Sequence, residues 1–220
     1  MITEELIRYF PVLYHMANAG TWPSIRGRGL LSTSALLDLF EIRGQERERI
    51  ESQHRPSSIE IRHSEHGAVV IRDQAPMREA ALRKCLRGMS VRQWYEMLNR
   101  KTFFWVTESR VTTLLGARLY RDREHLVIAV DCAGLVKAHS GNIRLSPINS
   151  GSTIYNPQPR GPETFRTITE YPFDERRKLR GNANAIAELT VDYAVTDLFR
   201  HTLKVERRRG TQIVETLYSN

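Results

Sequence analysis

Short stretches of strand-like and helix-like sequence alternate irregularly along this chain of 220 residues, and that alternation limits the fold. Residues 126–131 (LVIAVD) form an apolar run typical of a buried strand, and residues 101–106 (KTFFWV) are rich in aromatic and β-branched side chains. Between such strands lie short amphipathic segments, for example residues 90–98 with Ser90 as helix cap. Because no regular βαβ repeat appears, we predict a mixed sheet with short helices rather than a doubly wound parallel sheet.

The remaining elements are predicted from amphipathic spacing, helix caps and strand composition. Helices are expected at residues 3–10 with Thr3 as N-cap, 22–28, 34–40, 45–56, 76–86, 108–115 and 132–138. Strands are expected at residues 12–15, 185–191, 199–206 and 212–217, with a hairpin formed by residues 58–62 and 68–72. Residues 146–171 are rich in Pro, Gly, Asn and Ser, and a loop of that length is expected to be functional or to contain short strands.

Composition predicts one folded domain over residues 1–220. Hydrophobic residues make up 40% of the chain and charged residues 26%, an ordinary globular balance with enough apolar material for a core. No run approaches the roughly 18 apolar residues of a membrane span. The first residues (MITEELIRYF) are acidic where a signal peptide would be basic. We therefore expect a cytoplasmic protein that does not enter a membrane.

The net charge of +8, with an isoelectric point near 9.8, favours phosphate-rich partners. Basic residues gather late in the chain, at 176–181 and 204–210. A solvated basic surface explains the same excess, and no basic motif interleaved with aromatics is present. Charge alone therefore permits a nucleic-acid partner without requiring one.

Several common catalytic motifs are absent from the sequence. There is no phosphate-binding loop, no strand-linked G-x-G-x-x-G, no G-x-S-x-G and no H-E-x-x-H. Cys85 and Cys132 have no second Cys or His at metal-binding spacing, so we interpret them as reduced, buried thiols and expect no metal.

Three positions remain as candidates for chemistry. His15 ends a predicted strand, where its imidazole can bind a ribose hydroxyl or simply satisfy the backbone. Residues 103–110 (FFWVTESR) place aromatic rings before Arg110, which suits a flat ligand with a phosphate, although a core strand followed by a solvated helix explains them too. Glu188 interrupts the apolar segment AIAELTV. It either points outward by strand alternation or faces a cleft, where a carboxylate stabilises developing positive charge such as that of an oxocarbenium ion.

The segment LYHMANAGTWPSIRGRGLLS resembles the first signature of ADP-ribosyltransferases of the diphtheria-toxin and poly-ADP-ribose polymerase type. In that group a strand ends in a Tyr-His or Leu-His pair, and a helix leads to a Gly-Leu-Leu/Ser turn. The matching residues here are Tyr14, His15, Ile25, Gly29, Leu30, Leu31 and Ser32. The same opening is similar to that of tRNA 2′-phosphotransferases, which share the fold and use NAD.

The later segments resemble the DarT-type toxins, which transfer ADP-ribose onto DNA bases. FFWVTESRVTTLL is similar to their middle motif, and AELTVDYAVTDL to their last motif. Ile186 stands two positions before Glu188, where the arginine-modifying branch carries a second glutamate. The resemblance extends in order over most of the chain.

The resemblance implies an α+β fold with a split, mixed or antiparallel sheet flanked by short helices. It implies that NAD is the co-substrate, that Glu188 and Arg110 are catalytic, and that a nucleic acid is the acceptor, with a macrodomain-type antitoxin as a possible partner. The expected NAD-binding residues are His15, Tyr14, Ser32, Phe104 and Trp105. Acceptor contacts are expected from the loop residues Asn149, Ser150 and Ser152.

Two other classes of function fit the same sequence. One is a catalytically inactive basic module that binds nucleic acid through the same fold, with affinity that falls steeply with salt. The other is an NAD-dependent 2′-phosphotransferase or an NAD glycohydrolase.

Overall fold

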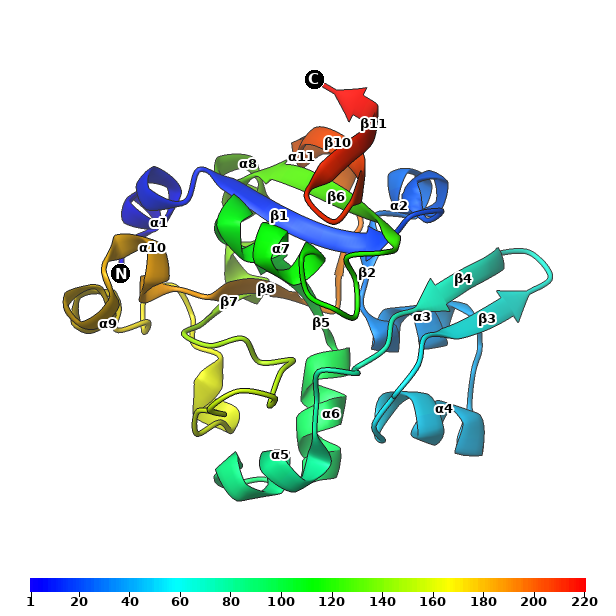
Figure 1. The fold of residues 1–220 in the computed structure, drawn as a ribbon, viewed down its shortest axis with the longest axis horizontal. Helices are drawn as coiled ribbons and strands as arrows, with labels where there is room; N and C mark the ends of the chain where they lie inside the picture. The colour runs from blue at the N-terminus through cyan, green and yellow to red at the C-terminus, as the bar shows by residue number, and fades with distance from the viewer.

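The computed structural model describes all residues, 1–220, and its centre is one seven-stranded sheet. The strand order is β11-β10-β6-β1-β5-β8-β7, and every neighbouring pair is antiparallel (Figure 1). In chain order these strands are β1 (Val12–Asn18), β5 (Lys101–Trp105), β6 (Glu124–Asp131), β7 (Ile143–Ser146), β8 (Glu188–Asp192), β10 (Thr202–Arg209) and β11 (Gln212–Ser219).

The sheet opens between its two central strands. β1 pairs with β6 along its whole length, from Val12 to Asn18, but pairs with β5 only where Tyr14 faces Trp105. Antiparallel strands stay about 5 Å apart only where their ladder is intact. Beyond that single pair, the sheet is split into a β11-β10-β6-β1 half and a β5-β8-β7 half.

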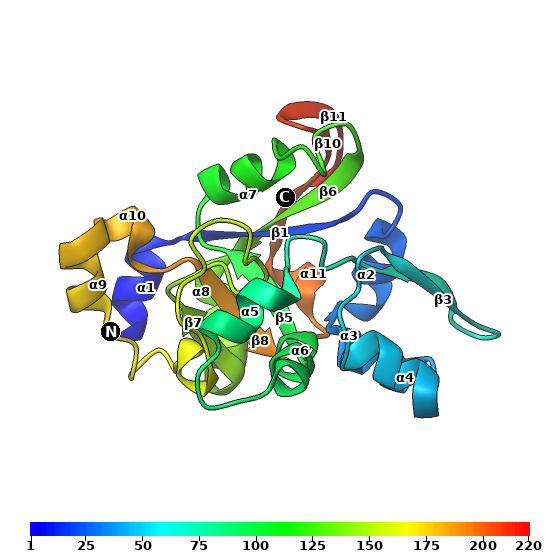
Figure 2. The ribbon, with the colours of Figure 1, turned by 60° about the horizontal axis from the view of Figure 1, so that its bottom comes forward.

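Helices cover both faces of the sheet, and alternation along the strands explains why. Leu13 and Ile128 join the large core with Leu135 of α8 (Cys132–His139), whereas Met16 and Val127 pack on the opposite face. There they contact the buried side of α7 (Glu108–Leu115). Figure 2 shows α7 on one side of β1 and α8 on the other. The other helices of the large core are α1 (Thr3–Tyr9), α2 (Trp22–Arg28), α9 (Phe173–Arg180), α10 (Asn182–Ala185) and α11 (Leu198–His201).

Two smaller groups of elements pack outside the large core, each around its own apolar cluster. A hairpin of β3 (Ile59–His63) and β4 (Gly67–Ile71) packs on α3 (Thr33–Leu39) and α4 (Gly44–Glu51) through a separate apolar cluster. The helices α5 (Glu79–Cys85) and α6 (Val91–Asn99) form another cluster around the fully buried Trp94. The pair β2 (Leu30–Leu31) and β9 (Ala194–Val195) joins the early part of the chain to the late part.

The predicted α+β class and antiparallel sheet are confirmed, and α2 and α7 have the predicted bounds. None of the helices is long and apolar enough to cross a lipid bilayer.

Several predicted boundaries were wrong. Ile2, not Thr3, occupies the N-cap position of α1. The 146–171 stretch begins at the end of β7, a strand that the prediction missed, and contains the 3-10 turn Pro162–Thr164; another such turn, Ser140–Asn142, precedes β7. α9 was not predicted either, because its polar sequence FDERRKLR buries only Phe173.

The placement of Glu188 in mid-strand was also wrong. Residues 182–185 form α10, so Glu188 is the first residue of β8. Similarly, residues 198–201 form α11 before β10 begins at Thr202.

Candidate active site

A cavity of about 930 Å³ lies at the split in the sheet. This volume is at the upper end of the range for small-molecule sites, which suits a dinucleotide-sized ligand. His15 on β1 and Glu188 on β8 both line it, so two candidates far apart in sequence lie on one surface. The remaining walls include residues of α2, β2, α3, β3, β4, α6, β5 and α7, and of the loop after β7.

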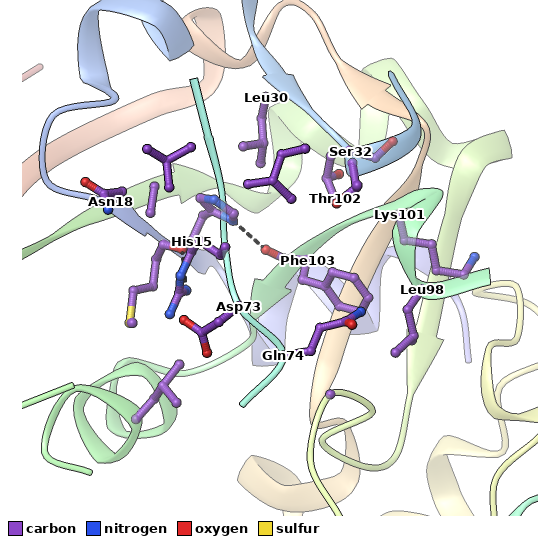
Figure 3. Close-up of a pocket in the computed structure, with 18 of the residues that line it drawn as sticks. His15, Asn18, Leu30, Ser32, Asp73, Gln74, Leu98, Lys101, Thr102 and Phe103 are labelled. Carbon is purple, nitrogen blue, oxygen red and sulfur yellow. Dashed lines mark hydrogen bonds between the residues drawn. The ribbon is translucent and has the colours of Figure 1, made fainter. Parts of the chain in front are cut away.

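His15 bridges the two halves of the sheet where the strand ladder is missing. Its Nδ1 lies 2.8 Å from the carbonyl oxygen of Phe103 on β5. Figure 3 shows this hydrogen bond as a dashed line. A carbonyl can only accept, so Nδ1 carries the proton. Burial, with the nearby Arg72 acting in the same direction, lowers the pKa of His15 to about 4. The imidazole is therefore neutral at pH 7, and its Nε2 is left as a hydrogen-bond acceptor.

Glu188 is buried, with 3% of its surface exposed, yet its carboxylate lines the cavity. The outward-facing alternative is therefore excluded. The backbone N–H of Ser150 lies 3.2 Å from both carboxylate oxygens, and the Ser150 hydroxyl donates to Oε2 at 2.7 Å. Burial raises the pKa of Glu188 to about 7, against the lowering effect of Ser150, Arg110 and Arg160. This carboxyl group is consequently balanced between its two protonation states near neutral pH.

The loop after β7 is held in place by Arg160. Its guanidinium donates to the carbonyls of Ser150 and Ser152, both at 3.0 Å. It lies over the Trp94 ring at 5.8 Å, and only 3% of the residue is exposed. Because Arg160 fixes the backbone of Ser150, it also fixes the donors that hold Glu188. Of the three predicted loop residues, Asn149 and Ser152 line the cavity, whereas Ser150 is fully buried behind Glu188.

Arg110 of α7 lies at the same end of the cavity as Glu188. One terminal nitrogen donates to Asn184 Oδ1 at 3.1 Å, while its buried Nε has no hydrogen-bond partner. Burial lowers the pKa of Arg110, although Glu188 acts to raise it. A half-buried guanidinium that lines a cavity is suited to bind an anion.

Cations outnumber acids in the cavity lining, an excess suited to the two negative charges of a pyrophosphate. The cationic residues are Arg28, Arg55, Arg72, Lys101 and Arg110, and the acidic ones are Glu60, Asp73 and Glu188.

Alternation along β5 decides which aromatic residues reach the cavity. Phe103 and Trp105 line it, whereas Phe104 is fully buried in the large core, with its ring centroid 5.9 Å from that of His15. Tyr14 packs beside Trp105 on the α7 face of β1 and does not line the cavity, although Met16 and Trp105 on that face do. The structure therefore brings Trp105, but neither Phe104 nor Tyr14, into the cavity wall.

Ser32 lies in the cavity wall directly after β2, which pairs with β9. Its hydroxyl caps α3 by accepting from Ala35 N at 3.1 Å, and its N–H donates to Tyr193 O at 2.9 Å. Gly29, which precedes β2, has φ 81° and ψ −174°, a region that is essentially restricted to glycine. A Cβ there would lie 2.3 Å from the Val195 carbonyl oxygen. The glycine of the first signature is thus required for β2 to approach β9.

Sequence reasoning missed Arg55 and Arg72, which line the cavity from the segments around the β3–β4 hairpin. Arg55 is 5% exposed and donates to Asn99 Oδ1 at 3.0 Å, and burial lowers its pKa to about 10. Neither residue belongs to a recognisable motif, so only the packing of the hairpin reveals them. Phe103 was inside a predicted segment, but the sequence does not reveal that its backbone carbonyl accepts a hydrogen bond from His15.

The two basic segments differ in their surroundings. In residues 204–210, ion pairs join Arg207 to Glu124 and Arg208 to Glu206, and Lys204 and Arg209 are also paired with acids. In α9, by contrast, Arg176, Lys178 and Arg180 have no carboxylate partner; the single ion pair of that helix joins Arg177 to Asp174. Free positive charge therefore remains on α9, and Arg180 is close enough to lower the pKa of Arg110.

This fold defines an α+β protein with a split antiparallel sheet and a cavity at the split. By its sequence the chain belongs to a family described as a family of unknown function, DUF7002, whose model matches residues 11–202. No curated protein matches it.

Among solved structures, the chain is similar to Thermosipho africanus DarTG in complex with ADP-ribose. The two share 15% sequence identity with a TM-score of 0.42. The match covers 89% of this chain and 43% of the other, so this chain spans less than half the length of that structure.

Proposed function

We propose that this protein is an NAD-dependent mono-ADP-ribosyltransferase with a nucleic-acid acceptor. One observation carries the proposal. His15, from the first of the three segments that resemble ADP-ribosyltransferases, and Glu188, from the last of them, line the same cavity. The cavity volume, the cation excess and the neutral imidazole of His15 all suit a dinucleotide that contains two riboses and a pyrophosphate.

NAD would supply an ADP-ribosyl group activated at its bond to nicotinamide. Glu188 would place negative charge beside the ribose carbon as positive charge develops there and nicotinamide leaves with the bonding electrons. The acceptor would then bond to that carbon and lose a proton. His15 would accept a hydrogen bond from a ribose hydroxyl through Nε2, and Arg110 would bind the pyrophosphate.

The acceptor class is inferred from charge near the Glu188 end. α9 carries Arg176, Lys178 and Arg180 without acidic partners, and α10 connects this helix to β8 and Glu188. Cations beside the reactive end would attract a phosphate backbone and make binding dependent on salt. A macrodomain-type partner that reverses the modification would fit this activity.

The direct test is incubation with NAD labelled in its adenylate part, together with single-stranded DNA, duplex DNA, RNA or protein. We expect nicotinamide release and transfer of label to a nucleic acid. Nicotinamide release without any labelled acceptor would instead identify an NAD glycohydrolase. If neither product forms with any acceptor, the proposed function is wrong.

The pH dependence of nicotinamide release should report the ionisation of Glu188. Because only the carboxylate stabilises positive charge, we expect activity to rise through pH about 7, the pKa of this buried group. Ser150→Ala removes the hydroxyl that donates to Oε2, and losing a bond to the charged form raises a pKa. The midpoint should therefore move to higher pH in this variant.

Ser152→Ala is the matched control, because the Ser152 hydroxyl accepts from Ile154 N at 3.5 Å and does not contact Glu188. Its pH midpoint should equal that of the wild type. An unchanged midpoint in Ser150→Ala would show that Glu188 does not control the profile.

A further inference from the structure

A second group of chemically competent side chains lies outside the cavity. His139 is the last residue of α8, Asp197 occupies the N-cap position of α11, and His201 ends α11. The two helices contact each other beside β6 (Figure 1), and none of the three residues lines the cavity.

The three side chains converge with the nitrogen and oxygen donors that zinc prefers. His139 Nε2 lies 2.6 Å from Asp197 Oδ1, and His201 Nε2 lies 3.2 Å from Asp197 Oδ2. One ligand atom from each residue can be chosen such that all three lie within 4.8 Å of one another. The imidazole rings are nearly perpendicular, at 84°. Two imidazoles and one carboxylate form a common three-residue set for Zn²⁺ and similar divalent ions, with water as a further ligand.

Partial exposure leaves room for that water. The side chains of His139 and His201 are 15% and 12% exposed, and that of Asp197 is 28% exposed. The group is thus held by the protein but reachable from solvent, which an exchanging metal ion requires.

Gly134 in α8 supplies an independent observation. A Cβ at this position would lie 2.7 Å from His201 Nδ1 and 2.9 Å from Asp131 Oδ2. Glycine at this position leaves space for the His201 ring to lie directly against α8, where Asp131 Oδ2 accepts from Gly134 N at 2.7 Å as the N-cap of the helix.

We propose that His139, Asp197 and His201 form a binding site for a divalent transition-metal ion of the Zn²⁺ type, separate from the cavity. The ion would clamp α11 to α8. Because Asp197 follows β9, and β9 pairs with β2 in the cavity wall, the ion would also stabilise that wall. Neither residue spacing nor a motif reveals the set, since His139 comes from a different helix.

The test uses the full chain after dialysis against a chelator, titrated with Zn²⁺ and, in parallel, with Co²⁺ as a spectroscopic probe. We expect one Zn²⁺ per chain, visible absorption from bound Co²⁺, and a higher melting temperature with Zn²⁺. In the variant with both His139→Gln and His201→Gln, affinity should fall by at least about 100-fold and the Zn²⁺ effect on melting should vanish.

His63 and His66 form the matched control, because their rings stack 4.6 Å apart on the hairpin, away from the proposed ligands. His63→Gln with His66→Gln should keep the wild-type affinity. Circular dichroism before metal addition establishes that each variant is folded. If the wild type binds no Zn²⁺, the three residues form only a hydrogen-bonded strut and the proposal fails. It also fails if the double variant of His139 and His201 binds Zn²⁺ like the wild type. Neither result would affect the proposed NAD chemistry.

Discussion

Glu188→Gln is expected to reduce nicotinamide release from NAD by at least about 100-fold, the usual cost of removing a charge aligned with a transition state. The substitution keeps the shape of a side chain that is 3% exposed, and the amide oxygen can still accept from Ser150. Initial rates of release at pH 8 measure the effect. Glu60→Gln is the matched control, because Glu60 lines the same cavity but is largely exposed and paired with Arg62. Equal rates for wild type and Glu188→Gln would contradict the assignment.

The same substitution should stabilise the folded protein above neutral pH. The pKa of Glu188 is about 7 in the fold and 4.5 as its ordinary value. Below pH 4.5 both states are protonated and no ionisation penalty exists. Between these values the unfolded chain ionises this carboxyl group while the buried group in the fold keeps its proton, so the stability of the fold falls as pH rises. Above pH 7 the full penalty, about 3 kcal/mol by linkage, applies to the glutamate but not to glutamine.

Thermal or urea unfolding at pH 8 and pH 4.5 tests this linkage. Glu188→Gln should melt several degrees higher than wild type at pH 8, and this advantage should shrink at pH 4.5. A variant that is inactive and less stable at pH 8 would indicate that Glu188 is a structural residue. Stability lost in exchange for a strained functional group is common at active sites.

Gly29→Ala is expected to destabilise the fold by more than about 3 kcal/mol, because it combines a glycine-only backbone conformation with a steric clash. The new Cβ would lie 2.3 Å from Val195 O and 2.4 Å from Thr196 Cα, and both are backbone atoms that cannot rotate away. Separation of β2 from β9 would also open the cavity wall at Ser32. Urea unfolding of the purified variant measures the loss.

Gly27→Ala is the control for this change. Gly27 lies in α2, and a Cβ there has no atom within 4 Å. Alanine in a helix is better than glycine by about 1 kcal/mol, so this variant should be equal to wild type or more stable. Equal free energies of unfolding for the two variants would show that the close contact between β2 and β9 does not contribute to the stability of the fold.

Much of the fold could be predicted because its strands are buried and therefore strongly patterned. Residues 126–130 are apolar on both faces, since helices cover both sides of β6. Elements whose residues are polar or short were missed, such as α9, which buries only Phe173, and β7, which occupies four residues before the long loop. Their structure depends on tertiary contacts rather than on local preference.

The candidate site could be predicted in part, for a related reason. A histidine in a predicted strand and the isolated carboxylate of Glu188 are visible in the sequence. The prediction that His15 ends this strand was wrong, because β1 continues to Asn18 and His15 lies in its middle. The partner of Glu188 is not, because Ser150 reaches it only through a loop held by the distant Arg160. Similarly, the face of β5 that reaches the cavity depends on register, which placed Phe103 and Trp105 there and Phe104 in the core. A shift of one residue would have reversed this outcome.

The central claim is that His15 and Glu188 bind the two ends of one NAD molecule across the split sheet. The most direct measurement is a crystal structure of Glu188→Gln soaked with NAD, since this variant should bind NAD without consuming it. The account predicts density in the cavity, with one ribose within hydrogen-bond distance of His15 Nε2 and the nicotinamide ribose beside residue 188. An empty cavity at saturating NAD, or NAD bound at another surface, would contradict it.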